Sequence, residues 1–156
     1  MKISIAGTGY VGLVTGVCLS DVGHDVTCLD IDSEKISKMQ QGISPIYEPG
    51  LDDLMKKNIQ ENRLHFTSDI KEAYANANVI FIAVGTPRRE DGSVDLTFIE
   101  TVAKEIGQSI THDCIVVVKS TVPVGTNDQV LQWINEQKRS DIRVDVISNP
   151  EFLREG

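Results

Sequence analysis

A glycine-rich segment near the amino terminus has the residue types and spacing that bind a dinucleotide. Gly7, Gly9 and Gly12 lie between a short β-branched stretch and a stretch typical of a helix. In such a turn the first glycine permits the tight bend, the second lets the backbone approach a pyrophosphate, and the third lets the helix pack close to the strand. The amides and the positive dipole at the helix start favour that anion. We therefore expect a dinucleotide site, with Asp30, after the next predicted strand, accepting hydrogen bonds from the adenosine ribose.

The same segment has one alternative interpretation, a secretory signal peptide. Lys2, the apolar run that follows it and the small residues at 18–20 are compatible with such a peptide. The glycines that would weaken its helical core are Gly7, Gly9, Gly12 and Gly16. No stretch of the sequence approaches the roughly 18 uninterrupted apolar residues of a membrane span. We therefore favour the dinucleotide interpretation and expect no membrane-spanning helix.

The composition narrows the classes of partner. The chain has 156 residues, which suits a single domain, and a formal net charge of −8. A nucleic-acid surface needs clustered Lys and Arg, and because the sequence has no basic block we expect no nucleic-acid partner. The cysteines Cys18, Cys28 and Cys114 show no C-x-x-C spacing. We interpret them as small core residues of a reduced, cytoplasmic protein, and we expect neither a disulfide framework nor a metal site.

Predicted strands and helices alternate along the whole chain. The glycine-rich turn leads into the first helix, and later helices are expected at residues 33–41, 51–61, 69–75, 96–109 and 126–138. Strands are expected at residues 2–6, 25–29, 64–67, 79–84, 114–118 and 144–147. The runs at 79–84 and 114–118 are continuously apolar, which is typical of strands covered on both faces.

This alternation predicts an α/β fold with a doubly wound, mostly parallel sheet, a Rossmann fold, in one domain over residues 1–156. We expect six strands in the order 3-2-1-4-5-6, with helices on both faces. Ligands bind such a sheet beyond the carboxyl ends of its strands. The segments expected at that edge are residues 7–12, 30–32, 85–87, 119–123 and 149–151.

Several of these loops carry longer motifs. They are GTGYVGL at residues 7–13, SPIYEPGL at 44–51, VGTP at 84–87, KSTVPVG at 119–125 and NPEFLREG at 149–156. Together, and in this order, they resemble the UDP-glucose/GDP-mannose dehydrogenase family over the whole chain. The role of the motif at 44–51 does not follow from its residues, because two prolines and a glycine could simply redirect the chain.

The resemblance implies an NAD-dependent oxidoreductase that oxidises a sugar C6 alcohol to a carboxylate. Two hydride transfers are implied, with a cysteine thiohemiacetal and a thioester between them. UDP-glucose, giving UDP-glucuronate, is the nucleotide-sugar substrate that we expect. GDP-mannose and UDP-N-acetylmannosamine remain alternatives, because recognition of the sugar is expected mainly beyond Gly156. A non-catalytic module that senses NAD is an alternative of a different class.

The resemblance also implies roles for individual residues. Asp30 would bind the adenosine ribose with Lys35 near it, and a carboxylate there favours NAD over NADP. Thr121 would help to hold a catalytic water, and Glu151 would assist as a base in thioester hydrolysis. The other residues expected around the cofactor are Gly7, Thr8, Gly9, Tyr10, Val11, Gly12, Val84, Gly85, Thr86, Pro87, Ser120, Thr121 and Glu155. Those expected to meet the nucleotide sugar are Glu151, Phe152, Leu153, Arg154 and Glu155.

Simpler interpretations of three of these side chains remain open. Thr121 could be only a turn hydroxyl, Glu151 an ordinary solvated carboxylate and Lys35 a solvated helix residue. The family's nucleophilic cysteine lies in a glycine-rich loop far downstream, and this chain ends at Gly156. We therefore expect the amino-terminal cofactor domain of a longer enzyme, inactive by itself, whose homo-oligomer contacts lie downstream of Gly156.

Overall fold

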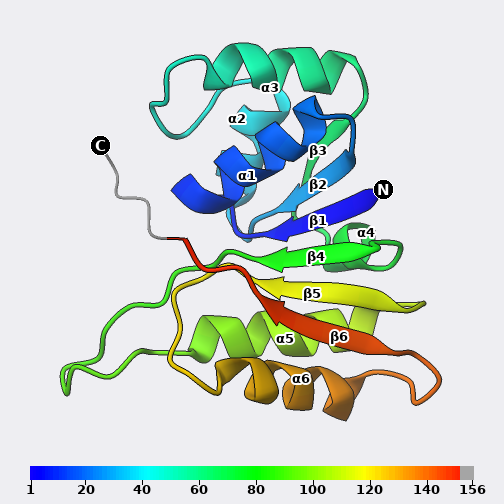
Figure 1. Cartoon of the computed structure of the whole chain (residues 1–156). Coiled ribbons are helices and arrows are strands. Elements are labelled where there is room, and N and C mark those ends of the chain that lie inside the picture. Colours follow the sequence, from blue (N-terminus) through cyan, green and yellow to red (C-terminus); the bar gives the residue numbers. More distant parts are fainter. Residues whose placement is uncertain (152–156) are drawn as a thin grey trace.

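Six parallel strands form one sheet at the centre of the structure, a computed structural model that describes residues 1–151 (Figure 1). They are β1 (Lys2–Ala6), β2 (Asp25–Leu29), β3 (Leu64–Thr67), β4 (Val79–Ile82), β5 (Cys114–Val118) and β6 (Val144–Ser148). Their order across the sheet is β3-β2-β1-β4-β5-β6, and every neighbouring pair is parallel. The predicted doubly wound fold and its strand order are thus confirmed.

Two sets of helices cover the two faces of the sheet (Figure 1). One set consists of α1 (Tyr10–Asp21), α2 (Ser33–Gln40) and α3 (Leu51–Gln60). The other consists of α4 (Ile70–Tyr74), α5 (Thr97–Ser109) and α6 (Thr126–Gln137). Each set encloses its own apolar cluster, the first mainly with β1, β2 and β3 and the second mainly with β4, β5 and β6. No helix within residues 1–151 has the length and apolar character needed to cross a membrane.

Aspartate side chains fix the starts of two helices. The Asp32 carboxylate accepts hydrogen bonds from the amides of Glu34 and Lys35, both at 3.0 Å, and so begins α2. Asp69 caps α4 in the same way. A side-chain cap of this kind stabilises a helix by about 1 kcal/mol. By beginning α2 where it does, Asp32 places Lys35 in the first turn, next to Asp30.

The two faces of the sheet are unevenly covered. On the face of α1, α2 and α3, Ile115 of β5 and Ile147 of β6 are 40% and 49% exposed. The predicted cover on both faces holds for β4, whose Val79 and Phe81 pack against the first cluster, but it is wrong at Ile115 of β5, because α1 packs mainly on β1 and β2. β4 also ends at Ile82 rather than at residue 84, which leaves residues 83–87 as a loop at the carboxyl edge.

Candidate functional site

The loops that follow β1, β4 and β5 meet at the carboxyl edge of the sheet, on the left of Figure 1. Within residues 1–151 they enclose two neighbouring clefts. The larger has a volume of about 440 Å³ and reaches Asp30, whereas the smaller has about 240 Å³ and reaches Thr121 and Glu151. Residues that line both clefts are Gly9, Ala83, Val84 and Gly85. The two clefts therefore form one path across the edge of the sheet.

Two glycines shape the turn at the centre of this path. Gly7 has a φ of +94°, a left-handed conformation that favours glycine. A Cβ added to Gly12 would lie 2.0 Å from the Gly7 carbonyl oxygen, so the turn and α1 can approach this closely only without a side chain. The predicted close packing of Gly12 is thus found at the ends of β1 and β4, and Gly16 extends it to β2, where its added Cβ would lie 2.5 Å from Cys28 Sγ.

The first turn of α1 offers backbone amides to the path. The helix begins after Gly9, and no side chain within residues 1–151 caps it. A Cβ added to Gly9 would meet nothing within 4 Å, so the approach to the turn is open. Uncapped helix amino termini bind phosphate groups through their amides and dipole. The residues present therefore fit the pyrophosphate of a dinucleotide.

Asp30 lies at the end of β2 and is held by several donors. Its Oδ2 accepts from the Thr8 hydroxyl at 2.5 Å, the Thr8 amide at 3.1 Å and Lys35 Nζ at 2.8 Å. Its Oδ1 accepts from the Asp32 amide at 3.1 Å. Burial, the largest single influence, raises the pKa of Asp30, but the bonds from Lys35, Thr8 and Asp32 outweigh it and lower the pKa to about 2. Asp30 is thus a fixed carboxylate, with more acceptor capacity left on Oδ1.

Tyr10 connects the glycine-rich turn to the loop at residues 44–51. Its hydroxyl donates a hydrogen bond to the Glu48 carboxylate. The loop is also held from the other side, because the Ser44 amide donates to Asp52 on α3 at 3.2 Å. The motif at 44–51 therefore braces the first turn of α1, which carries the amides just described. The sequence alone did not predict this contact of the motif.

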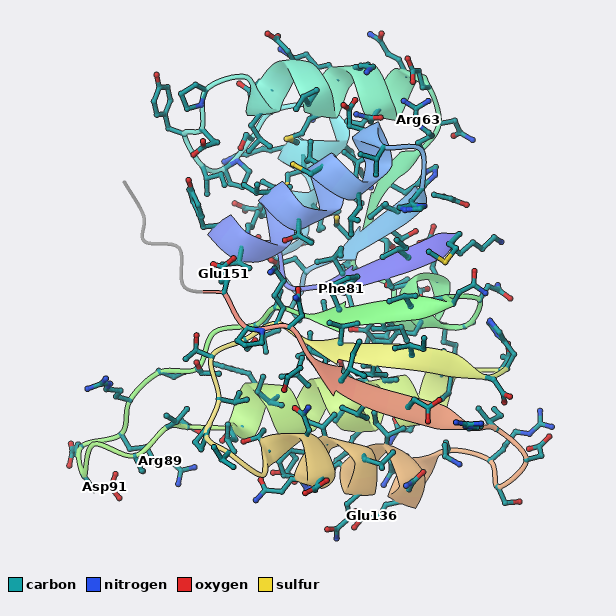
Figure 2. The ribbon with its side chains drawn as sticks, in the orientation of Figure 1. Arg63, Phe81, Arg89, Asp91, Glu136 and Glu151 are labelled. Carbon is teal, nitrogen blue, oxygen red and sulfur yellow. The ribbon has the colours of Figure 1, made fainter. Side chains whose placement is uncertain are left out.

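The smaller cleft brings together the loops that follow β4, β5 and β6. Thr86 Oγ1 donates to the Thr121 carbonyl at 3.0 Å, and Ser120 Oγ donates to the Val84 carbonyl at 2.7 Å. The first two loops are therefore bonded to each other. Glu151 lines the same cleft as Thr121, and Figure 2 shows it beyond the end of β6. A hydroxyl and a carboxylate that line one cleft can hold and deprotonate a water molecule.

Comparison with known proteins agrees with this geometry. The family model for the UDP-glucose/GDP-mannose dehydrogenase family, NAD binding domain, matches residues 1–156. The chain belongs to this family. The fold described above is its NAD-binding domain, so the predicted family and the predicted cofactor, NAD, are confirmed.

Curated relatives match the whole chain. It is 54% identical over 156 residues to UDP-glucose 6-dehydrogenase YwqF of Bacillus subtilis, and 54% identical over 157 residues to a UDP-glucose 6-dehydrogenase of Rhizobium meliloti. Each match includes 100% of this chain and 36% of the relative. The chain therefore spans about a third of the length of these dehydrogenases.

Solved structures of the same family share the fold. A GDP-mannose dehydrogenase of Pseudomonas aeruginosa superimposes with a TM-score of 0.92 at 45% identity, and a UDP-glucose dehydrogenase of Pyrobaculum islandicum with 0.94 at 39%. Each comparison covers 99% of this chain and 37% of the other. Because family members named for different sugars share this domain, its fold alone does not distinguish their substrates.

Most of the residues expected around NAD line the two clefts of this family domain. They are Gly7, Thr8, Gly9, Tyr10, Val11, Asp30, Val84, Gly85, Thr86, Ser120 and Thr121. Gly12, Lys35 and Pro87 line neither cleft, although Gly12 contacts the turn and Lys35 donates to Asp30. Phe152, Leu153, Arg154 and Glu155 lie outside the described residues.

Sequence reasoning missed an apolar part of the larger cleft. Ile31 and Phe98 line it and are 90% and 53% exposed, which gives a surface suited to a flat adenine ring. Tyr74 lies in the same lining, and within residues 1–151 its buried hydroxyl has no hydrogen-bond partner. Burial, together with the charge of Glu105, raises the pKa of Tyr74. One available signal was Ile31 itself, an apolar residue directly after Asp30 in the segment 30–32 that was expected at this edge.

The cysteines divide into two kinds. Cys28 and Cys114 are buried, as predicted, but Cys18 is exposed, so its interpretation as a core residue is wrong. Burial raises the pKa of Cys28 to about 12, and burial with the charge of Asp113 raises that of Cys114 to about 11. Since the thiolate is the reactive form, neither of these two is a nucleophile near neutral pH. Cys18 lies two turns along α1 from Tyr10, about 12 Å along the helix axis.

Proposed function

We propose that this chain is the NAD-binding domain of an enzyme that oxidises UDP-glucose to UDP-glucuronate. When bound, NAD accepts a hydride from the sugar in each of two successive oxidations. The observation that carries the proposal is that Thr121 and Glu151 line one cleft, at the end of the path away from Asp30. Hydrolysis of a thioester needs a held water and a base, whereas oxidation to an aldehyde needs no water. The 54% identity to UDP-glucose 6-dehydrogenases supports this choice of sugar.

At the adenosine end, we assign recognition of the ribose to Asp30. Lys35, at 2.8 Å, would hold the carboxylate in place, and Ile31 with Phe98 would contact the adenine. The amides at the start of α1 would bind the pyrophosphate. NAD is favoured over NADP because a 2′-phosphate would meet the Asp30 carboxylate, and two like charges at that distance repel.

At the nicotinamide end, Thr121 would hold the attacking water and Glu151 would accept its proton. The water oxygen would bond to the thioester carbon, the carbon–sulfur bond would break, and a cysteine thiolate would leave. We assign that cysteine, most of the sugar recognition and the contacts of a homo-oligomer to a part of the protein downstream of Gly156. We assign contact with the nucleotide sugar to residues 151–155 and the whole protein to the cytoplasm.

GDP-mannose is the second candidate substrate, because the domain is 45% identical to a GDP-mannose dehydrogenase. The test is the rate of NADH formation by the full-length enzyme with UDP-glucose, GDP-mannose and UDP-N-acetylmannosamine. We expect kcat/KM for UDP-glucose to exceed the others by about 10-fold or more. A higher value with another sugar would overturn the substrate assignment. NAD binding without NADH formation from any of the three would favour the non-catalytic sensing module.

A further inference from the structure

Lys119 is a partly buried cation at the catalytic end of the path. Its side chain is 13% exposed and that of its partner Glu151 is 25% exposed. Among the ion pairs within residues 1–151, only one other charged side chain is nearly as little exposed, that of Asp30, which is 14% exposed. The least exposed charges of these pairs thus lie at the two ends of the cofactor path. Removing a charged group from water costs free energy, so we expect a charge in such a cleft to have a role.

The sheet fixes where this ammonium lies. The Lys119 amide donates to the Ile82 carbonyl of β4 at 2.9 Å, and the Asn149 amide donates to the Val118 carbonyl of β5 at 3.0 Å. The first bond continues the pairing of β4 with β5, and the second continues the pairing of β5 with β6. Lys119 Nζ lies 3.4 Å from Asn149 Oδ1 and 3.6 Å from Glu151 Oε2. The Lys119 backbone is thus held directly after β5 by a bond to β4, and its ammonium lies near Asn149, whereas Glu151 belongs to the loop beyond β6.

We infer that Lys119 is a positioning residue for the Glu151 carboxylate, and this inference rests on the proposed role of Glu151 as the base. A partly buried ammonium needs an anionic partner, and its attraction keeps the carboxylate in the cleft instead of in bulk water. A separation of 3.6 Å is longer than a direct hydrogen bond. The lone pairs of Glu151 Oε2 are therefore not occupied by Lys119 and can accept from a water. Lys119 acts through Glu151 and moves no proton itself.

The resonance of the Lys119 ammonium tests this contact without any need for turnover. In the 156-residue chain with ¹⁵N-labelled lysine side chains, we expect Glu151→Gln to shift the Lys119 Nζ resonance. The control Glu136→Gln changes an exposed glutamate on α6, labelled in Figure 2, and should leave that resonance unchanged. If Glu151→Gln left the Lys119 resonance unchanged, the inference would be overturned, whatever the substrate of the enzyme.

Kinetics of the full-length enzyme separate positioning from a merely structural role. We expect Lys119→Met to lower kcat about 10-fold or more, with the Kd for NAD changed less than about twofold, and Lys119→Arg to restore most of kcat. In a Glu151→Gln background, Lys119→Met should lower kcat by less than about a further twofold. The control Lys57→Met removes an exposed partner of Asp21 and should leave kcat unchanged.

The inference would be overturned if the losses of kcat from the Lys119 and Glu151 substitutions multiplied in the double variant, because the two residues would then act independently. It would also be overturned if Lys119→Met weakened NAD binding about 10-fold. The second result would mean that the ammonium holds the cofactor instead. A wild-type enzyme that oxidises no nucleotide sugar would refute the proposed function. The resonance measurement would still decide whether Lys119 holds Glu151.

Discussion

The hydroxyl and the amide of Thr8 both donate to Oδ2 of Asp30, over 2.5 and 3.1 Å. This contact ties the end of β2 to the glycine-rich turn after β1. The carboxylate proposed to bind the ribose and the amides proposed to bind the pyrophosphate are therefore held at a fixed separation. Thr8 is itself fully buried, so we infer that it acts on NAD through Asp30.

Asp30→Asn should weaken NAD binding about 10- to 100-fold, because it removes a charge-assisted hydrogen bond to the ribose. The same change leaves Lys35 without its carboxylate partner and close to where a 2′-phosphate would lie. The preference for NAD over NADP should therefore shrink. Calorimetric titration with both cofactors measures this, and Asp21→Asn, which alters a surface pair with Lys57, is the matched control. Unchanged discrimination in Asp30→Asn would refute the assignment.

The stability of the domain should depend on the ionisation of Asp30. Its pKa is lowered from 3.8 to about 2, so the folded state binds this proton less readily than the unfolded chain. The resulting stabilisation, about 2 kcal/mol, is complete above about pH 5 and is lost as the pH falls towards 2. Urea unfolding of the wild type and of Asp30→Asn from about pH 6 to 3 should show their difference shrinking with acid. A constant difference would contradict the lowered pKa of Asp30.

A thiol reagent should label one cysteine of the folded 156-residue chain rapidly. Cys18 is exposed, whereas Cys28 and Cys114 are buried with raised pKa values and should react only after unfolding. Because the nucleophilic cysteine and most of the sugar recognition are assigned to a part downstream of Gly156, this chain should also sustain no NADH formation from UDP-glucose by itself. Rapid labelling of two thiols would contradict the burial of Cys28 and Cys114, and sustained NADH production would refute the assignment of the nucleophile to the downstream part.

Glu151→Gln in the full-length enzyme should leave the Kd for NAD within about twofold of the wild type, because the carboxylate serves the hydrolytic step. A covalent thioester should accumulate, and intact-mass spectrometry after mixing with UDP-glucose and NAD detects it. Glu136→Gln, on the exposed side of α6, is the control and should turn over normally. A variant that shows full turnover and no adduct would remove Glu151 from the mechanism.

The elements that could be predicted are those that local patterns determine. Three features lie close together in the sequence: the β-branched run of β1, the glycines after it, and Asp30 directly after β2. Their spacing was enough to predict the turn and the carboxylate assigned to the ribose. Contacts such as Tyr10 with Glu48 join distant loops and depend on how α1 and α3 pack. The exposure of Ile115 was unpredictable for a related reason. A continuous apolar run indicates a strand but not what lies against each face.

The number of NADH molecules formed per UDP-glucose consumed tests the central claim most directly. We hold that one cleft serves two hydride transfers and the hydrolysis that follows them, with Glu151 as the base. The full-length enzyme would be given limiting UDP-glucose and excess NAD, with NADH measured by absorbance and the sugar product by chromatography. We predict two NADH per UDP-glucose and UDP-glucuronate as the product. One NADH per sugar with an aldehyde product, or none despite bound NAD, would contradict the account.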